Sequence, residues 1–349
     1  MAKVCAMTAE TSAGAGEVDA FTIIQLGTGY TRAKLVQSAV EIGLFGLLAK
    51  APATEAEIRT ALGIHPRIAR DFLDAVVAIG LLLRDGERYR NSAGAQRFLV
   101  PGEPEYVGGF LELATVLYDA WSGLTATLRR GGPPPEYRPE DLYGDEPKNP
   151  EFFAKYVEGM DSANKNVAPE LVSRIDWSRA GSFVDVGGCR GNVAAALVRA
   201  HPHLSGTVFD VTPTEPYFHE HMARLGTAGR VSFHVGDFFR DPLPPADVLI
   251  FGHVLHDWAP EDRRMLLGKA FDALPPGGSV VVYDRMIDDE RTNLPNLLLS
   301  LNMIIGTPGG SEYTVGECHR WLGEAGFRVA STETLPTRDV LVVAGKPAR

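Results

Sequence analysis

Short apolar runs that end in an acid, a glycine or a histidine recur along the second half of the chain. Seven of them are predicted strands: Phe183–Val186, Thr207–Phe209, Val231–Val235, Val248–Phe251, Val280–Tyr283, Arg328–Thr332 and Val340–Ala344. Helical stretches separate most of these runs, a pattern typical of an open α/β sheet. Ligands gather at the carboxyl ends of the strands in such sheets, so the residues just past each run are the candidates for function.

The first half of the chain is mainly helical in pattern. From Ala20 to about Lys50, apolar residues are spread over more than one face, so we expect either a dimer interface or an internal helix that is buried on two sides. Residues 54–100 predict a capped helix, a turn at Gly63, a second helix over Pro66–Ile79 and a hairpin around Asp85-Gly86. This order of elements predicts a winged helix.

Composition narrows the class of protein. The 349 residues are 45% hydrophobic and 22% charged, which is typical of a globular protein with two domains. The net charge of −10 argues against a broad nucleic-acid surface and against an anionic membrane surface. Residues 54–100 carry seven arginines against six acids, a poor surface for phosphates, so a DNA-binding regulator is the less favoured alternative from a different class.

Three cysteines are unclustered and form no C-x-x-C pair. They indicate neither a disulfide framework nor a thiolate metal site, so we predict a reducing, cytoplasmic location. The sequence has no apolar run near 18 residues and no N-terminal signal pattern, so no membrane partner is expected. Residues 1–18, rich in Ala, Gly, Thr and Glu, are predicted to be a disordered tail.

A glycine-rich turn follows the first of the seven predicted strands. Asp185 precedes the turn, Gly187 opens it, and a predicted helix comes after it. Asp210, at the end of the next strand, is placed to accept hydrogen bonds from both hydroxyls of a ribose. Cys189 and Asn192 stand where a dinucleotide fingerprint has its second and third glycines, so a cofactor with a ribose and no phosphate, such as S-adenosylmethionine, is favoured over NAD.

Later strand ends carry further chemistry. Asp237 and Phe238 suit an adenine ring through a hydrogen bond and stacking, although Asp237 alone is equally a helix cap. The imidazole of His256 is a candidate general base, which Asp284 and Glu312 would orient. The competing hypothesis is a metal held by the two histidines 253 and 256 beside residue 257.

Six segments together resemble a known family over nearly the whole chain: DVGGCRG, VFDV, GDFF, HVLHDW, VVVYD and TPGGSEYT. They resemble class I S-adenosylmethionine-dependent O-methyltransferases of the plant caffeic-acid and bacterial polyketide-tailoring type. The resemblance implies a winged-helix dimerisation domain over 19–105, a helical bridge with part of the acceptor pocket over 106–175, and a Rossmann-like seven-stranded methyltransferase domain over 176–349. It also implies a homodimer, a small aromatic acceptor from natural-product biosynthesis, and S-adenosylhomocysteine as the cofactor product.

The resemblance also implies roles for individual residues. Asp185 and Gly187 would hold the methionine end of the cofactor and Asp210 the ribose, with adenine contacted by Asp237 and Phe238 and lying close to Trp258. His256 would be the base, flanked by Asp284 and Glu312. Acceptor-binding positions are predicted at Trp121, Phe153, Asn302 and Met303, with core packing as the alternative for the two aromatic residues.

The sequence departs from the family pattern at two positions, and one rival activity is compatible with the same cofactor. Cys189 replaces a common glycine, and an aspartate rather than the more usual glutamate stands at position 284, which shortens its reach toward His256. The rival activity keeps the cofactor and transfers the methyl group to carbon or nitrogen, with or without a metal.

Overall fold

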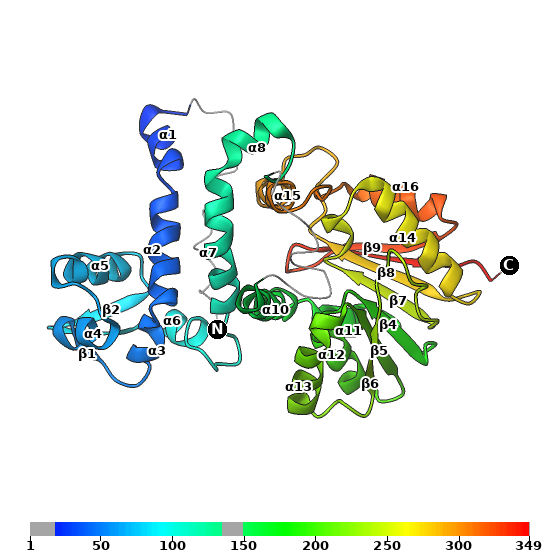
Figure 1. The fold of residues 1–349 in the computed structure, drawn as a ribbon, viewed down its shortest axis with the longest axis horizontal. Helices are drawn as coiled ribbons and strands as arrows, with labels where there is room; N and C mark the ends of the chain where they lie inside the picture. The colour runs from blue at the N-terminus through cyan, green and yellow to red at the C-terminus, as the bar shows by residue number, and fades with distance from the viewer. Residues whose placement is uncertain (1–17, 135–148, 349) are drawn as a thin grey trace, which may run out of the picture. The chain divides into compact units, whose positions relative to one another are not determined.

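The computed structural model describes residues 18–134 and 149–348, which fall into two compact units, 1–96 and 97–349 (Figure 1). Of the tail predicted over residues 1–18, all but residue 18 lies outside the described residues. Within 18–134 and 149–348, no helix combines the length and the apolar character needed to cross a membrane.

The N-terminal unit is mainly helical. Its elements are α1 (Ala20–Gly27), α2 (Tyr30–Glu41), α3 (Leu44–Leu48), β1 (Ala53–Thr54), α4 (Glu55–Leu62), α5 (Pro66–Ala78), β2 (Leu82–Asp85), β3 (Arg88–Asn91) and the start of α6 (Ala93–Phe98). The helical pattern expected from Ala20 to Lys50 is therefore three helices. One break comes at Gly43, whose φ of 75° is left-handed and ends the helical path.

The predicted helix, turn, helix and hairpin are all present in this unit. Thr54 and Glu57 form a capping box at the start of α4, and Gly63 ends that helix in a left-handed conformation. The hairpin β2–β3 and the short β1 make a three-stranded antiparallel sheet of order β1-β3-β2. Ile58 and Leu73 are fully buried, so the two helices share one core.

A seven-stranded sheet organises the second unit, as predicted. Its strands are β4 (Ser182–Val186), β5 (Ser205–Asp210), β6 (Val231–Val235), β7 (Val248–Gly252), β8 (Ser279–Asp284), β9 (Arg328–Thr334) and β10 (Val340–Gly345). The order is β6-β5-β4-β7-β8-β10-β9, with β10 antiparallel to both of its neighbours and the rest parallel. The order reverses at β4, so the loops after β4 and β7 diverge there and leave room for a ligand.

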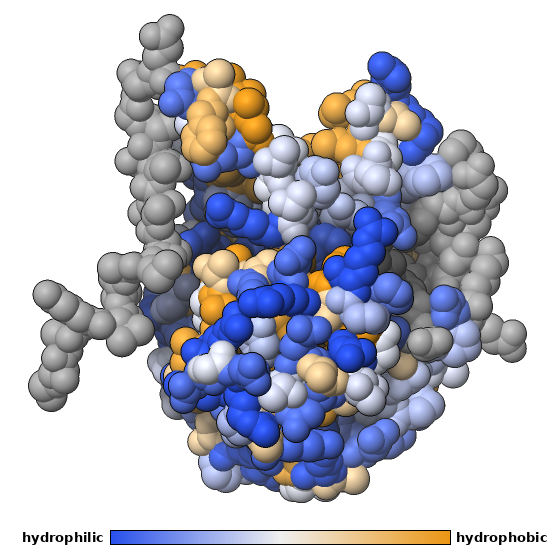
Figure 2. All heavy atoms as spheres, turned by 90° about the vertical axis from the view of Figure 1, so that its left-hand side faces the viewer, coloured by the Kyte–Doolittle hydropathy of each residue, from blue (hydrophilic) through white to orange (hydrophobic). Residues whose placement is uncertain are grey.

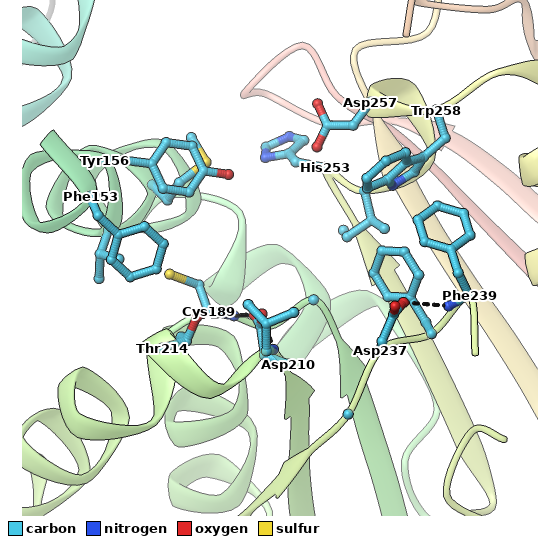
Figure 3. A pocket seen from close by; sticks show the side chains of 18 of the residues that line it. Phe153, Tyr156, Cys189, Asp210, Thr214, Asp237, Phe239, His253, Asp257 and Trp258 are labelled. Atoms are coloured by element: carbon cyan, nitrogen blue, oxygen red, sulfur yellow. Dashed lines mark hydrogen bonds between the residues drawn. The ribbon is translucent and has the colours of Figure 1, made fainter. Parts of the chain in front are cut away.

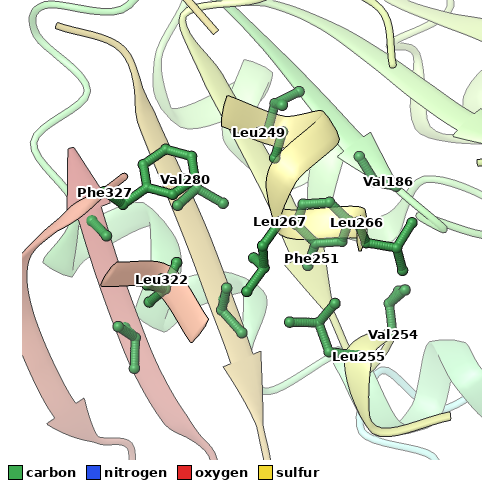
Figure 4. Close-up of a cluster of buried hydrophobic side chains, with 14 of the residues drawn as sticks. Val186, Leu249, Phe251, Val254, Leu255, Leu266, Leu267, Val280, Leu322 and Phe327 are labelled. Atoms are coloured by element: carbon green, nitrogen blue, oxygen red, sulfur yellow. The ribbon is translucent and has the colours of Figure 1, made fainter. Parts of the chain in front are cut away.

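Helices cover both faces of this sheet. One face packs on α11 (Ala168–Arg174), α12 (Asn192–Ala200) and α13 (Glu215–Leu225), and the other on α14 (Pro260–Ala273) and α16 (Val315–Glu324). In the hydrophobic core between the sheet and the helices α14 and α16, Phe251 of β7 packs with Leu266 and Leu267 of α14 (Figure 4). The part of this unit that the structure describes also contains α7 (Gly108–Ser122), α8 (Leu124–Arg130), α10 (Pro150–Asn164) and α15 (Leu294–Gly306).

Candidate active site

A cavity of about 370 Å³ lies at the carboxyl ends of β4 to β7, as a doubly wound sheet predicts (Figure 3). Its walls come from the turn after β4, the ends of β5, β6 and β7, and the helix α10. The lining residues include Phe153, Tyr156, Gly187, Cys189, Asp210, Asp237, Phe238, His253, Asp257 and Trp258. Five residues predicted for the cofactor, Gly187, Asp210, Asp237, Phe238 and Trp258, therefore share one cavity, with the sixth, Asp185, beneath the turn.

The glycine-rich turn is built closely over Asp185. A Cβ on Gly188 would lie 2.6 Å from the carboxyl carbon of Asp185, so only glycine fits there. The backbone N–H of Cys189 donates to Asp210 Oδ2 at 2.8 Å, and that of Val211 donates to Oδ1 at 2.7 Å. Cys189 has a φ of 50°, in the left-handed region that favours the glycine of the family pattern, and its side chain lines the cavity.

Burial dominates the titration of both acids at this turn. It raises the pKa of Asp210 to about 6, against the lowering effect of the two backbone N–H groups. Burial raises the pKa of Asp185 to about 7, and the neighbouring charge of Asp210 adds to the increase. The carboxyl of Asp210 is thus ionised above about pH 6, in the state that accepts two hydroxyl hydrogen bonds.

Aromatic rings line the far side of the cavity. The ring of Trp258 meets those of Phe238 and Phe239 edge-on, at centroid distances of 5.6 and 4.6 Å. Asp237 lies beside them, and its Oδ1 accepts a hydrogen bond from the backbone N–H of Phe239 at 2.8 Å. Asp237 therefore stabilises the turn over residues 238–240 and is not the helix cap that the sequence allowed. Its Oδ2 lies 3.3 Å from the Nε of Arg240.

His256 lies in the short 3₁₀ turn after β7 and is held by a carboxylate. Its Nδ1 is 2.7 Å from Glu312 Oε1, whereas Asp284 Oδ1 is 3.8 Å from the same nitrogen. The shorter aspartate side chain thus leaves Glu312 as the direct partner, and Asp284 accepts instead from the hydroxyl of Tyr313. When the ring of His256 is neutral and Glu312 accepts from Nδ1–H, Nε2 carries the lone pair that can take a proton. The acid nearest to Nε2 is Asp257, whose Oδ1 lies 3.7 Å from it.

The three acids set the protonation state of His256. Burial by itself lowers the pKa of this imidazole, but the charges of Glu312, Asp284 and Asp257 outweigh it and raise the pKa to about 10. Burial also raises the pKa of Asp284 to about 6, against the pull of the imidazolium. His256 and the two acids that flank its Nδ1 are nearly inaccessible, so their charges interact through protein rather than water.

Arg263 braces the loops that carry His256 and Glu312. From α14, its Nε donates to the carbonyls of Leu255 at 2.9 Å and Trp258 at 2.8 Å, on either side of His256 and Asp257. Its Nη2 donates to the carbonyl of Ser311 at 2.7 Å, next to Glu312. The guanidinium is buried against the Tyr313 ring, 4.8 Å away. The sequence analysis missed this residue because nothing in the pattern of α14 separates it from the exposed Arg264.

A second histidine-carboxylate pair was also missed. His253 Nε2 lies 2.7 Å from Asp339 Oδ1, to which Arg285 Nε donates at 3.0 Å. Asp339 comes just before β10 and is fully buried, an arrangement that only the antiparallel return of β10 brings to the site. No cluster of three metal-ligating groups is found within 18–134 and 149–348. The two histidines proposed as metal ligands are each bonded to a different carboxylate.

The helix α10 is tied to the glycine-rich turn by a buried polar network. Asp161 pairs with Arg190, which follows Cys189, and the Nε2 of His221 is hydrogen-bonded to Asn192 Oδ1 at 2.9 Å. Burial raises the pKa of Asp161 to about 6, against the effect of Arg190. The network fixes the helix that supplies Phe153 and Tyr156 to the cavity.

The predicted acceptor residues are only partly brought together. Trp121 of α7 donates from Nε1 to Asn302 Oδ1 of α15 at 2.9 Å, which joins two residues 181 positions apart. Met303 follows on the same helix, and Phe153 lines the cavity described above. Trp121, Asn302 and Met303 are not among the lining residues of that cavity, so any acceptor contact they make lies beyond it.

The charge of the lining suits a cationic ligand without phosphates. Three acids line the cavity, Asp210, Asp237 and Asp257, against a single arginine, Arg240, which is already paired with Asp237. A pyrophosphate would need helix N–H groups and cations that this set does not supply. The residues therefore fit a nucleoside with a positively charged tail.

Comparisons with known proteins agree with this geometry. An O-methyltransferase domain model matches residues 121–328, and an O-methyltransferase dimerisation domain model matches residues 24–101. A tetracenomycin polyketide synthesis 8-O-methyl transferase of Streptomyces glaucescens is 47% identical over 93% of this chain and 96% of its own. An N,N-dimethyltransferase of Streptomyces rimosus is 44% identical over the same shares.

Solved structures give the same fold. Human N-acetylserotonin methyltransferase, solved in complex with S-adenosylmethionine, superposes with a TM-score of 0.86 at 26% identity. The match covers 96% of this chain and 99% of that one.

Proposed function

The chain belongs to the S-adenosylmethionine-dependent O-methyltransferase family, and from this we propose that it methylates a hydroxyl of a small aromatic acceptor with His256 as the general base. The observation that carries the proposal is the pair His256–Glu312, in which a buried carboxylate fixes the ring and leaves Nε2 to take a proton. The tetracenomycin relative, named for 8-O-methyl transfer in polyketide synthesis, supports an aromatic polyketide-like acceptor.

The cofactor is S-adenosylmethionine, and we propose which residues hold it. Asp210 binds the ribose hydroxyls, Asp237 and Phe238 contact the adenine close to Trp258, and the turn from Asp185 to Gly188 receives the methionine end. When bound, the sulfonium supplies a methyl group that is already activated for transfer. The protein therefore has to orient the acceptor oxygen and remove its proton.

The proton path runs through His256. As the acceptor oxygen forms its bond to the methyl carbon, Nε2 takes the hydroxyl proton, and the resulting imidazolium is stabilised by Glu312, with Asp284 and Asp257 at 3.8 and 3.7 Å. The same acids raise the pKa of His256 to about 10 in the protein without ligands, so the ring must be neutral before it accepts the proton. A cation in the cavity favours that neutral form.

Oxygen is the acceptor that best explains this base. A neutral amine attacks without prior loss of a proton, whereas a hydroxyl is a weak nucleophile until a base removes its proton. The relative that is 44% identical carries the name of an N,N-dimethyltransferase, so sequence identity alone does not choose between the two acceptor atoms. The buried histidine-carboxylate pair is what favours oxygen.

The test compares His256→Ala with His219→Ala, a matched change at an exposed histidine of α13. We expect His256→Ala to bind S-adenosylhomocysteine nearly as tightly as the wild type by calorimetry and to lose most of its turnover, whereas His219→Ala keeps both. Phenolic and naphtholic acceptors are screened by S-adenosylhomocysteine release, and NMR of the product identifies the methylated atom. Full activity of His256→Ala would refute the base assignment.

We also propose that the protein is a homodimer joined through its N-terminal unit. The helix α1 buries none of its residues, and Phe21, Ile24 and Leu26 are 66%, 61% and 74% exposed. Hydrophobic side chains stand out at the upper end of the view in Figure 2. Such a face in a region that matches a dimerisation domain suits a second copy of the chain.

Sedimentation of two variants tests the dimer. Ile24→Asp on α1 should convert the dimer to monomer, whereas Val329→Asp on the exposed edge strand β9 should leave it dimeric. A wild-type monomer at micromolar concentration would contradict the proposal.

A further inference from the structure

His253 lines the cavity and has a backbone conformation that is uncommon for a residue other than glycine. It has a φ of 52°, which is uncommon for a residue with a Cβ, and it follows the last residue of β7. Its backbone N–H donates to the carbonyl of Tyr283 at 3.0 Å, which fixes the turn. The left-handed turn sends the side chain to the cavity wall, beside Asp257.

The ring of His253 is oriented by a fully buried acid. Asp339 Oδ1 accepts from Nε2 at 2.7 Å and from the Nε of Arg285 at 3.0 Å. These partners outweigh the effect of burial and keep the pKa of Asp339 below its usual value, so it stays a carboxylate. In the neutral form of the ring, this bond places the proton on Nε2 and leaves Nδ1 as an acceptor. Within the described residues, no group is bonded to Nδ1.

The two histidine-carboxylate pairs lie next to each other. The rings of His253 and His256 are stacked at 20° with centroids 5.7 Å apart, and each has one nitrogen bonded to its own acid. Figure 3 shows His253 at the rim of the cavity, with Asp257 and Tyr156 on either side in this view. The proposed mechanism uses only His256, so the second pair has no role in it.

We propose that His253, held by Asp339, accepts a hydrogen bond from a second hydroxyl of the acceptor, and that the acceptors are aromatic compounds with two neighbouring hydroxyl groups. One hydroxyl loses its proton to His256, while its neighbour, in an ortho or peri position, donates to Nδ1 of His253. The two ring centroids are 5.7 Å apart. Neighbouring hydroxyl oxygens are about 2.7 Å apart, so each oxygen can lie within hydrogen-bond distance of its own ring when the two oxygens sit between the rings. This inference rests on the proposed O-methyl transfer and names the substrate class of the same site.

A purely structural role is the alternative. His253 and Arg285 both neutralise the buried Asp339, and that network joins the ends of β7 and β8 to the start of β10. If this were its only role, a substitution of His253 would lower the melting temperature and leave the choice between acceptors unchanged. The test therefore measures a ratio between two acceptors rather than activity with one.

The matched acceptors are 1,8-dihydroxynaphthalene, kept under argon, and 1-naphthol, which lacks the second hydroxyl. We expect the wild type to favour the diol at least tenfold in kcat/KM, the size of one well-placed hydrogen bond. In His253→Asn, whose side chain tolerates the left-handed backbone, that ratio should fall toward one. Asp339→Asn should reduce it in the same direction, and His219→Asn on α13 should keep the wild-type ratio.

Each outcome decides the inference. An unchanged ratio in both variants, or no preference in the wild type, overturns it while leaving the methyl transfer intact. If the wild type methylates neither compound, calorimetry with the protein saturated with S-adenosylhomocysteine gives the same ratio as binding affinities. A binding preference for the diol that His253→Asn loses supports the inference even if the proposed transfer to oxygen fails, and equal binding refutes it.

Discussion

Replacing Glu312 with glutamine removes one negative charge from His256 and keeps the size of the side chain. The two groups are 2.7 Å apart and buried, and unit charges about 4 Å apart interact by about 4 kcal/mol at an effective dielectric constant of about 20. That energy corresponds to a pKa change of about 3. Because Asp284 and Asp257 keep their charges, we expect the pKa of His256 to fall from about 10 to about 7 or 8 in Glu312→Gln.

NMR titration of the histidine Cε1–H signals measures this change directly, with the resonance of His256 identified by its loss in His256→Gln. The matched control is Glu324→Gln, on the exposed face of α16. Although Glu312→Gln has more neutral base at pH 7, its maximal turnover should be about 10- to 100-fold lower, because the imidazolium formed during transfer loses a charged partner. A His256 signal that titrates at the same pH in wild type and variant would refute this account.

Two other predictions concern the cofactor site and the brace behind the base. Asp210 becomes protonated below about pH 6, so the affinity for S-adenosylhomocysteine should weaken about tenfold for each pH unit below that value. Calorimetry should show that Asp210→Asn binds weakly and with an affinity that does not depend on pH. A wild-type affinity that does not vary from pH 5 to 8 would contradict this prediction. Arg263→Lys should lower kcat about 10- to 100-fold and lower the melting temperature, because an ammonium cannot satisfy the carbonyls of both loops. The neighbouring exposed Arg264→Lys should change neither, and equal effects of the two substitutions would show that the brace is not specific.

The inner strands of the sheet, such as β4, β7, β8 and β10, could be predicted from the sequence because they are buried on both faces and are continuous apolar runs. The edge strands β6 and β9 are largely exposed, but all seven strands were placed within about two residues of their observed bounds. The N-terminal helices were harder, since their exposed apolar positions blur the helical period. The break at Gly43 depends on one left-handed residue, which a periodic pattern does not reveal.

The site was predictable where a residue lies at the end of a strand or in the turn that follows it. Asp210 ends β5, Asp237 comes shortly after β6 and His256 lies in the turn after β7, and parallel strands bring these ends to one edge. Asp339 breaks this rule, because it precedes an antiparallel strand and only the register of β10 with β8 brings it to His253. The role of Arg263 could not be predicted from the sequence either, because its partners are backbone carbonyls on two separate loops.

The charges explain why the sequence alone could not say how His256 works. In the sequence, two acids, Asp284 and Glu312, indicate a base at His256. In the structure Asp257 adds a third charge, and the three acids outweigh burial and raise the pKa of His256 to about 10. The acids therefore oppose proton uptake before the reaction and favour the imidazolium after it. In the proposed mechanism, a cationic ligand weakens the first effect by favouring the neutral ring, and its charge disappears when the methyl group leaves, so the proton on His256 is favoured once transfer has occurred. This coupling requires Glu312 to be bonded to Nδ1 and Asp284 to be held back at 3.8 Å, and those distances come from the fold.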